Sequence, residues 1–229
     1  MKKIIMAGVS SGIGLACAKK ILELNFEVLG ISRTKPVIDH PNLEWVACDL
    51  SSKKAIDELC KTHLKNKNVD GLIYCAGVGH FGALEQLSAN DFSKDMQLNC
   101  LSAMQMTKAI LPAMKKNQAG FCVYLGSEAA LKGAKQGGLY CATKFALRGF
   151  TQSLAEEVRS DHIRVTLINP GLVKTNFHNE ASFEPSAEKG CSIDLDLIAD
   201  QIVSLVQQKE LGFISEITIK PYKNIIAKK

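Results

Sequence analysis

The stretch KIIMAGVSSGIGLACAKKILEL, residues 3–24, decides the fold of this chain. Its opening is a short apolar run typical of a buried strand, and its second half repeats apolar residues at the period of an amphipathic helix. Three glycines with the spacing G-x3-G-x-G lie between them, a pattern that differs from both the P-loop and G-x-G-x-x-G. The stretch predicts the first strand, turn and helix of a βαβ unit.

The glycine-rich turn is a candidate phosphate site. Glycine allows the chain to turn tightly and to approach a ligand closely, and the free N–H groups at the start of a helix attract anions. The spacing alone also fits an ordinary connection between a strand and a helix. The residues expected to contact a diphosphate are Gly8, Ser10, Ser11, Gly12, Ile13 and Gly14.

The rest of the chain repeats this alternation. Further apolar runs predict strands at residues 26–32, 43–49, 70–76, 120–127, 163–171 and 212–221, and helical periodicity predicts helices at about 52–64, 99–116, 140–159 and 195–208. Alternating strands and helices form right-handed βαβ units. We predict an α/β chain with a three-layer Rossmann-type fold, a doubly wound parallel sheet of about seven strands flanked by helices. We expect a single domain over residues 1–229, with a small substrate lid around 176–191.

Composition excludes several classes of partner. The 229 residues are 46% hydrophobic and 22% charged, and the net charge is +5, which is the balance of an ordinary globular protein. The basic residues are scattered, so we expect no nucleic-acid partner. No apolar stretch approaches about 18 residues, and the apolar run at the N-terminus is shorter than a signal-peptide core, so we expect no membrane span and no secretion.

The eight cysteines carry no metal-site pattern. No Cys-x2-Cys pair is present, and no pair has zinc-finger spacing to a histidine. We predict no metal. Many unpaired thiols are typical of a reducing compartment, so we predict a cytoplasmic protein.

The end of the second expected strand indicates which dinucleotide is preferred. In a doubly wound sheet, ligands bind beyond the carboxyl ends of the strands, where an acidic residue binds a ribose 2′-OH and an arginine accommodates a 2′-phosphate. Arg33 stands at this position and Lys35 adds positive charge. The pattern favours NADP(H) over NAD(H), although Arg33 could also be an ordinary surface residue.

Tyr140 and Lys144 are the strongest candidates for chemistry. They are four residues apart in a helical segment, so their side chains share one face. A nearby ammonium lowers the pKa of a phenol, which is ordinarily near 10, and so allows general acid–base catalysis at neutral pH. A Tyr-x3-Lys pair is common by itself, and an accidental exposed pair stays possible without further context.

The surrounding motifs supply that context. Over about residues 3–175 the chain resembles the short-chain dehydrogenase/reductase family, of the NADP-preferring type. The motifs that carry the resemblance are GVSSGIG at 8–14, CDL at 48–50, CAG at 75–77, LN at 98–99, GS at 126–127, YCATKFAL at 140–147 and NPGLVKT at 169–175.

The resemblance implies hydride transfer between a nicotinamide and a carbonyl or secondary alcohol of a small substrate. Tyr140 would be the acid–base, and Lys144 would lower its pKa and hold the nicotinamide ribose. Ser127 would hydrogen-bond the substrate oxygen, and Asn99 would anchor a water that connects Lys144 to solvent. A catalytically silent dinucleotide sensor or partner-binding protein on the same fold is the alternative, because fold does not determine function.

The resemblance also implies further cofactor contacts and an assembly. The implied contacts are Asp49 and Leu50 at the adenine, Ala76 and Gly77 in a small turn beside the cofactor, and Pro170, Gly171, Val173 and Thr175 at the nicotinamide. A homodimer or homotetramer would form through the helices expected at 99–116 and 140–159.

The chain departs from the family pattern at three positions. Ala7 replaces a threonine and Cys75 replaces an asparagine, so two side-chain hydrogen bonds should be missing around the turn. Glu128 follows Ser127 directly, and we expect a solvated charge there more readily than a substrate contact. Tyr74 begins another Tyr-Cys-Ala tripeptide, at residues 74–76, but no lysine follows it at the spacing of Lys144 after Tyr140, so we expect Tyr74 to pack in the core. His178 lies in the lid segment. We expect it to be a surface or loop residue, and a contact with the substrate is the less favoured alternative.

Overall fold

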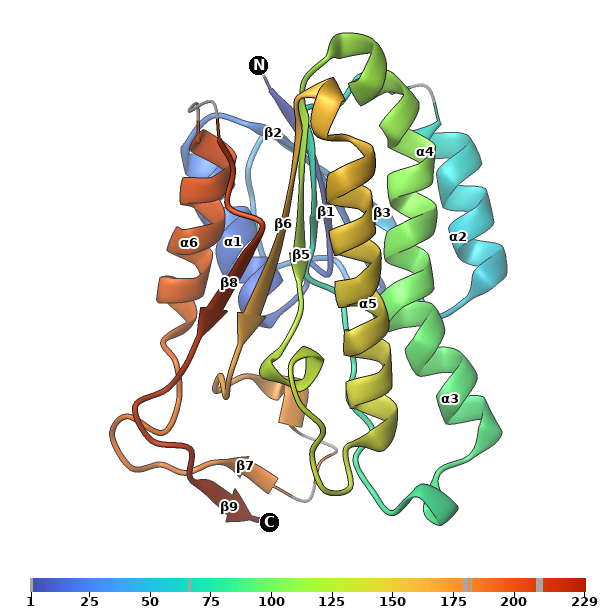
Figure 1. Ribbon diagram of the computed structural model, residues 1–229. Helices are drawn as coiled ribbons and strands as arrows, with labels where there is room; N and C mark the ends of the chain where they lie inside the picture. The colour runs from blue at the N-terminus through green and yellow to red at the C-terminus, as the bar shows by residue number, and fades with distance from the viewer. Residues whose placement is uncertain (1, 66, 179–180, 182, 209–211) are drawn as a thin grey trace.

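The sheet has the predicted architecture. The computed structural model describes residues 2–65, 67–178, 181, 183–208 and 212–229 (Figure 1). Seven parallel strands are arranged in the order β3-β2-β1-β4-β5-β6-β8, which runs outward in both directions from β1 and β4 and confirms the doubly wound, Rossmann-type fold. The strands are β1 (Lys3–Ala7), β2 (Glu27–Ser32), β3 (Leu43–Ala47), β4 (Gly71–Tyr74), β5 (Gly120–Leu125), β6 (Ile163–Pro170) and β8 (Glu216–Ile219).

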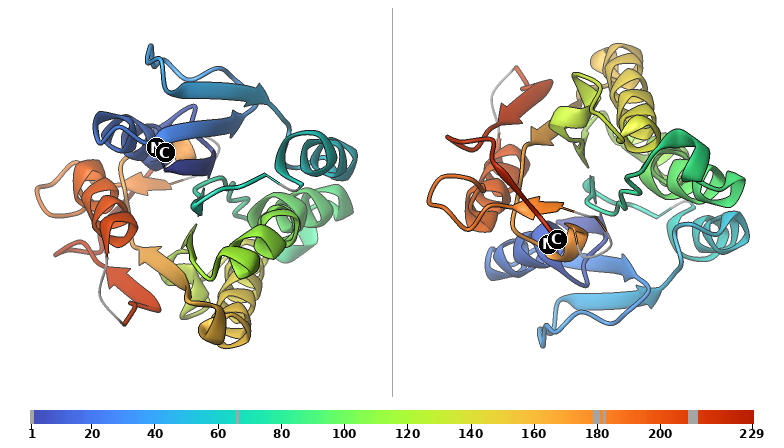
Figure 2. Two further views of the ribbon diagram at one scale, coloured as in Figure 1. Left: turned by 90° about the horizontal axis from the view of Figure 1, so that it is seen from above. Right: turned by 90° about the horizontal axis from the view of Figure 1, so that it is seen from below.

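Helices cover both faces of the sheet. One face is covered by α1 and α6, and the other by α2, α4 and α5 (Figures 1 and 2). The helices are α1 (Gly12–Glu23), α2 (Lys53–Leu59), α3 (Ala89–Met96), α4 (Ser102–Asn117), α5 (Gly138–Glu157) and α6 (Leu195–Gln207). Every residue of β4 is buried, whereas β3 at the edge is partly exposed. The central strands therefore read as continuous apolar runs, as expected for a parallel sheet buried on both sides.

The helix predicted at residues 99–116 begins ten residues too late. Helix α3 already starts at Ala89, where Ser88 and Asp91 form a capping box, and the π-helical turn η3 (Gln97–Leu101) joins it to α4. Most of α3 is exposed, so it lacks the long apolar stripe on which the prediction depended. The Ser-x-x-Asp pattern at its start was the available signal.

The lid segment contains a strand that was not predicted. Strand β7 (Phe183–Pro185) pairs antiparallel with β9 (Ile226–Lys228), which is the last element of the chain. Both strands have three residues and lie below the main sheet in Figure 1, beyond the carboxyl ends of its strands. Elements this short carry no clear alternation of side chains, so pairing between distant segments decides their conformation.

Tyr74 packs in the core as predicted. Its side chain is fully buried among the residues under α4, and its hydroxyl donates to the Leu98 carbonyl at 2.5 Å. Among the described residues, no helix has the length and apolar character that crossing a membrane requires.

Candidate active site

The glycine-rich turn joins β1 to α1 at the carboxyl end of the sheet. Gly8 and Gly12 have φ values of +85° and +55°, which side chains with a Cβ rarely adopt. A Cβ on Gly8 would lie 2.7 Å from the main-chain nitrogen of Ala76, and one on Gly14 would lie 2.1 Å from the Gly8 carbonyl oxygen. Main-chain packing that only glycine permits therefore closes the turn. Ser11 is the N-cap of α1 but makes no side-chain capping bond, so it leaves the first N–H groups of the helix available.

The end of β2 presents positive charge. Arg33 and Lys35 are exposed directly after the strand, while Ser32 is buried and accepts a hydrogen bond from the Trp45 indole at 3.1 Å. Ser32 and Trp45 thus hold the strand end, from which the two cationic side chains project. The arrangement can accept an anionic group.

Asp49 and Leu50 follow β3 in different environments. The Asp49 carboxylate is exposed and accepts from the main-chain N–H and the hydroxyl of Ser51, at 3.0 and 2.8 Å. Leu50 is buried in the core. Its main-chain groups are what it can offer to a ligand.

Tyr140 and Lys144 lie on one face of the first turns of α5 and are both buried. The Lys144 Nζ donates to the Leu125 carbonyl at 2.9 Å and lies 5.7 Å from the centre of the Tyr140 ring. Burial lowers the pKa of Lys144 to about 8, against a smaller opposing effect of Cys75 and Cys100. Burial also raises the pKa of Tyr140 to about 12, although a hydrogen bond with Ser127 works in the opposite direction. The Tyr140 pKa is therefore raised rather than lowered as expected, because desolvation outweighs the hydrogen bond with Ser127.

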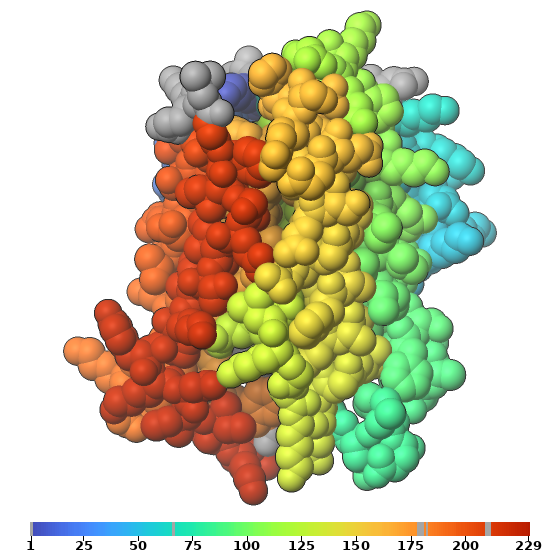
Figure 3. Space-filling model, viewed as in Figure 1, coloured from blue at the N-terminus to red at the C-terminus, as the bar shows by residue number. Residues whose placement is uncertain are grey.

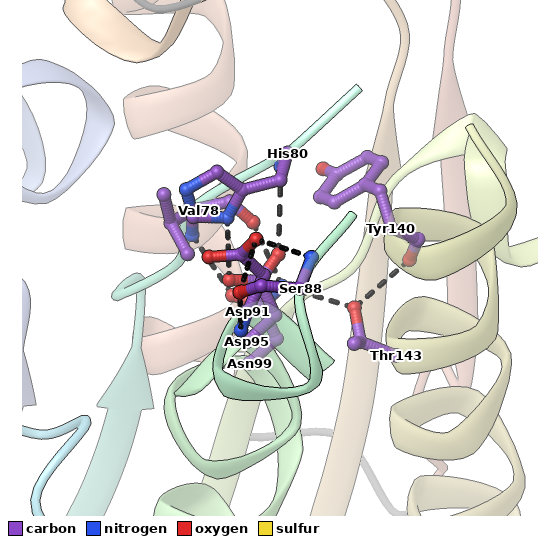
Figure 4. Close-up of polar contacts among 8 residues, drawn as sticks. All are labelled: Val78, His80, Ser88, Asp91, Asp95, Asn99, Tyr140 and Thr143. Carbon is purple, nitrogen blue, oxygen red and sulfur yellow. Dashed lines mark hydrogen bonds and ion pairs between the residues drawn. The ribbon is translucent and has the colours of Figure 1, made fainter. Parts of the chain in front are cut away.

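Asn99 lies inside the π-helical turn η3 and is fully buried (Figure 4). Its Nδ2 donates to the Val78 carbonyl at 2.8 Å and to the Thr143 hydroxyl at 2.9 Å, and its Oδ1 accepts from the Val78 N–H at 2.8 Å. The amide protons are thus fully used, and an anchored water would have to bind the second lone pair of Oδ1 or a main-chain carbonyl. A Cβ on Gly77 would lie 3.3 Å from Asn99 Oδ1 and 3.5 Å from Lys144 Nζ, so this glycine keeps the space between the two side chains open.

Tyr74 supports the same π-helical turn from the opposite side. The Ser102 N–H bonds to the Gln97 carbonyl, one residue further back than in an α-helix, so it does not bond to the Leu98 carbonyl. The hydroxyls of Tyr74 and Ser102 donate to that carbonyl, at 2.5 and 3.0 Å. The sequence predicted only that Tyr74 packs in the core, not that it supports this turn.

Ser127 is held at the end of β5 by a polar relay. Its N–H donates to Asn169 Oδ1 at 3.2 Å, and Asn169 Nδ2 donates to Glu216 Oε1 at 2.6 Å. Glu216 in turn binds Arg148 of α5, with Nε 2.9 Å from Oε1. Asn169, Glu216 and Arg148 were missed, because the relay joins residues on three separate elements and no local pattern reveals it.

The segment after β6 returns to the glycine-rich turn. A Cβ on Gly12 would lie 3.6 Å from Cγ2 of Thr175, which brings the two predicted cofactor segments together. Gly171 donates to the Ile219 carbonyl at 2.8 Å, and Val173 forms a parallel bridge with Ile193. Pro170 ends β6. The described residues that were predicted to contact a cofactor therefore gather at the carboxyl edge of the sheet.

The departures from the family pattern have small structural consequences. Cys75 donates its N–H to the Ala7 carbonyl at 2.9 Å, so a main-chain bond ties the turn after β4 to β1. Burial raises the pKa of the Cys75 thiol to about 12. Glu128 is not a solvated charge, because its side chain is only 19% exposed and pairs with Lys220 at 3.5 Å. The side chain of His178 lies outside the described residues.

The cysteines and acidic residues do not form a metal centre in the described part of the chain. There, no group of three or more His, Cys, Asp or Glu side chains comes together as metal ligands would. All eight cysteines are free.

The sheet order, the glycine-rich turn and the Tyr–Lys pair together define a Rossmann-type protein of the oxidoreductase class. The family model for short chain dehydrogenases matches residues 2–185. The chain therefore belongs to the short-chain dehydrogenase/reductase family.

Individual relatives agree with this assignment. A 3-ketodihydrosphingosine reductase from Bacteroides thetaiotaomicron is 33% identical over 175 residues, which span 76% of this chain and 65% of the reductase. The uncharacterized oxidoreductase YbbO of Escherichia coli K12 is 30% identical over 224 residues, covering 94% of this chain and 82% of YbbO. The crystal structure of a metagenomic short-chain oxidoreductase in complex with NADP has a TM-score of 0.77 at 28% identity, over 97% of this chain and 98% of that one.

Proposed function

We propose that this protein is an NADP(H)-dependent oxidoreductase that interconverts the carbonyl group and the secondary alcohol of a small substrate, with Tyr140 as the acid–base. The observation that carries the proposal is the meeting of Tyr140 and Lys144 from α5 with Asn99 from the π-helical turn, around the space beside Gly77. Ser127 joins this set through its hydrogen bond with Tyr140. Such a group can polarise a carbonyl and supply a proton.

The residues at the carboxyl edge fit a dinucleotide. Gly8, Gly12 and Gly14 form a cradle that a Cβ would fill or strain, at the uncapped start of α1. The exposed Arg33 at the end of β2 suits a 2′-phosphate better than a hydroxyl. The metagenomic relative was crystallised in complex with NADP, which supports the same cofactor here.

In the reduction, bound NADPH would supply the hydride. Ser127 Oγ accepts from the Ala129 N–H at 3.1 Å and is hydrogen-bonded with Tyr140, and its hydroxyl proton would turn to the substrate oxygen when a carbonyl binds. Tyr140 donates its proton to the same oxygen as negative charge develops there. A tyrosine pKa of about 12 keeps that proton on the phenol until the oxygen needs it.

Lys144 restores the proton that Tyr140 gives away. Its pKa of about 8 means that it is mostly protonated at pH 7 but releases a proton readily. We propose that solvent reprotonates Lys144 through the space beside Gly77, which Asn99 Oδ1 borders.

The experiment that tests this function follows NADPH oxidation at the nicotinamide absorbance with a panel of ketones and diketones. We expect wild type to reduce some of these carbonyls and Tyr140→Phe to reduce none at a comparable rate. Tight NADPH binding without turnover on a broad panel would instead favour a dinucleotide sensor.

The cofactor preference has its own test. We expect Arg33→Ala to weaken NADPH binding about tenfold and to leave NADH binding unchanged, because a charge-assisted contact to the 2′-phosphate contributes roughly 1.5 kcal/mol. Titration of both cofactors into wild type and variant measures this. An unchanged NADPH/NADH ratio contradicts the assignment to NADP(H).

We propose a homodimer or homotetramer assembled through α4 and α5. A groove between these helices is lined by apolar side chains, among them Leu111 and Phe150, and by polar and charged ones such as Lys108 and Glu157. Met104 and Phe145 on the same helices are exposed. Light scattering should detect an oligomer that Met104→Glu weakens, whereas Leu24→Glu at the exposed end of α1 should leave it intact. A monomeric wild type contradicts the assembly.

We assign the protein to the cytoplasm on its thiols. All eight cysteines are free, and burial raises the pKa of several of them, Cys75 and Cys122 to about 12. Unpaired thiols in this number suit a reducing compartment.

A further inference from the structure

We propose that the substrate of this site is an uncharged ketone with an aromatic ring beside its carbonyl group, or the corresponding alcohol. The inference rests on the proposed function and names its substrate class. It is carried by three phenylalanines around Tyr140, here called the aromatic wall: Phe81, Phe177 and Phe183.

The aromatic wall borders the catalytic tyrosine directly. The rings of Phe81 and Phe177 have their centres 5.3 and 5.4 Å from the centre of the Tyr140 ring, tilted by 54° and 55°. Phe183 meets Phe81 edge to face at 5.0 Å. The centre-to-centre distances are in the range of favourable aromatic pairs, so the wall offers ring faces and edges to which an aromatic ligand can pack.

The wall is assembled from two separate segments. Phe81 lies in the loop after β4, and Phe177 lies two residues after Thr175 in the segment after β6. A Cβ on Gly79 would lie 2.7 Å from Phe81 Cε2 and 2.8 Å from Phe177 Cζ, so both rings pack closely over this glycine. The two segments that approach the nicotinamide site thus also carry its apolar border.

The end of the chain holds the third ring in place. Phe183 is the first residue of β7, and its partner in the antiparallel pair with β9 is Lys228. In the space-filling view the C-terminal segment (red) lies at the same end of the molecule as the residues just before α5 (Figure 3). The position of Phe183 is therefore determined by main-chain pairing rather than by its ring contacts alone.

The residues that follow Phe81 line a small, mostly apolar pocket, to which Gln136 adds one polar side chain. Leu84, Leu87 and Ala134 line it together with the main chain of Gly82 and Gly138, and none of its lining side chains is ionisable. The Gly82 N–H donates to the Gln136 carbonyl at 2.8 Å, which ties the loop after Phe81 to the start of α5. The pocket has the apolar lining that receives the uncharged body of a ligand.

Two ionisable side chains next to the wall and to Ser127 are already paired. His80 precedes Phe81, and its Nδ1 lies 2.7 Å from the Oδ1 of the fully buried Asp95 (Figure 4). Glu128 pairs with Lys220. Lys144 Nζ lies 5.7 Å from the centre of the Tyr140 ring, but it already donates to the Leu125 carbonyl. A substrate carboxylate beside the wall would have to give up its hydration and compete for this one ammonium, which is costly.

Three ketones of similar size test the inference: acetophenone, 2-octanone and 4-acetylbenzoate. We expect the kcat/KM of acetophenone to exceed that of 2-octanone by about tenfold, because aromatic pairs contribute beyond their buried area. We expect no measurable reduction of 4-acetylbenzoate. Saturation-transfer NMR with the NADP⁺-loaded protein measures the Kd of each ketone without turnover.

Matched variants identify the wall as the cause. Phe177→Leu and Phe81→Leu keep an apolar side chain but remove a ring, and either should reduce the preference for acetophenone over 2-octanone to about twofold or less. Phe92→Leu on the exposed face of α3 is the control and should keep the preference. Removal of residues 225–229 should raise the KM of acetophenone more than its kcat, because β9 no longer holds Phe183.

The outcomes separate the two proposals. If 2-octanone or 4-acetylbenzoate is reduced as well as acetophenone, or if both ring variants keep the preference, the substrate class is wrong and the oxidoreductase function stands. If acetophenone binds with the expected preference but no ketone is reduced, the preference for an uncharged aromatic ligand stands and the oxidoreductase function is wrong.

Discussion

The tripeptide Tyr-Cys-Ala occurs twice, and its two tyrosines have contrasting surroundings. Tyr74 ends β4 with no exposed surface, and its hydroxyl contacts the Leu98 carbonyl and the Ser102 hydroxyl. Tyr140 begins α5 with 8% of its surface exposed, between Ser127 and the aromatic wall. Burial raises the pKa of both phenols. A raised pKa is therefore no sign of catalysis by itself, and access to a substrate and to a proton source makes the difference.

The lysine is the second difference between the two copies. Lys144 lies one helical turn after Tyr140, and burial lowers its pKa to about 8. Tyr74 ends a strand, and the residues that follow it turn toward the glycine-rich loop. Under the proposed function, Lys144 would resupply Tyr140 with a proton, whereas Tyr74 would only keep its own.

Tyr140→Phe should have the largest effect in this comparison. We expect kcat for ketone reduction to fall by about 10²- to 10⁴-fold, because the proton donor is removed. The free energy of unfolding should fall by only about 0.5–1.5 kcal/mol, since the ring and its packing remain and one hydrogen bond, with Ser127, is lost. Steady-state kinetics and denaturant unfolding measure the two quantities. A variant that keeps more than a tenth of the wild-type kcat contradicts the role of Tyr140.

Lys144→Met should lower the activity of the protein and raise its free energy of unfolding. The Lys144 pKa in the folded chain is below its ordinary 10.5, so folding at neutral pH requires a buried charge, and methionine should stabilise the chain by about 1–3 kcal/mol. The wild-type chain should recover part of this deficit as pH rises from about 8 toward 10.5, because the unfolded lysine then binds more protons than the folded one. Thermal unfolding of both proteins between pH 7 and 10 tests the sign. A difference in stability between the two proteins that widens as the pH rises contradicts this prediction.

The pH dependence of reduction should report Lys144 rather than Tyr140. Wild-type kcat should be flat below pH 8 and fall by up to about tenfold per pH unit above it, as Lys144 loses the proton that resupplies Tyr140. The same profile in Arg33→Ala is the control, because Arg33 lies at the other end of the cofactor site. Activity that rises through pH 8 would exclude Lys144 as the proton source.

Tyr74→Phe should have the smallest effect. Loss of its hydroxyl should cost about 1 kcal/mol of stability, because the Ser102 hydroxyl still donates to the Leu98 carbonyl. We expect kcat to change by less than about threefold, since the π-helical turn that holds Asn99 keeps one of its two supports. Unfolding and kinetics measured side by side with Tyr140→Phe complete the comparison. A loss of activity comparable to that of Tyr140→Phe would remove the distinction between the two tyrosines.

Much of the fold was accessible from the sequence because its signals are local. Apolar runs predicted all seven strands of the main sheet, and their alternation with helices along the chain indicates an α/β fold with a parallel sheet. Helix α3 was missed because its face toward the core is narrow, and β7 and β9 were missed because each has only three residues. The pairing of β7 with β9 joins segments about forty residues apart, which no local pattern reports.

The features of the candidate site also fall into those that local sequence predicts and those that depend on contacts between distant segments. By itself, the sequence determined the glycine-rich turn, the Tyr140–Lys144 spacing and the family, because each depends on residues a few positions apart. Only the tertiary structure decided the direction of the Tyr140 pKa shift, the burial of Glu128, the Asn169–Glu216–Arg148 relay and the aromatic wall. Desolvation and contacts between distant segments depend on what folding brings together. The sequence therefore identified the chemical groups, and the packing determined how strongly each holds its proton and what kind of molecule can approach it.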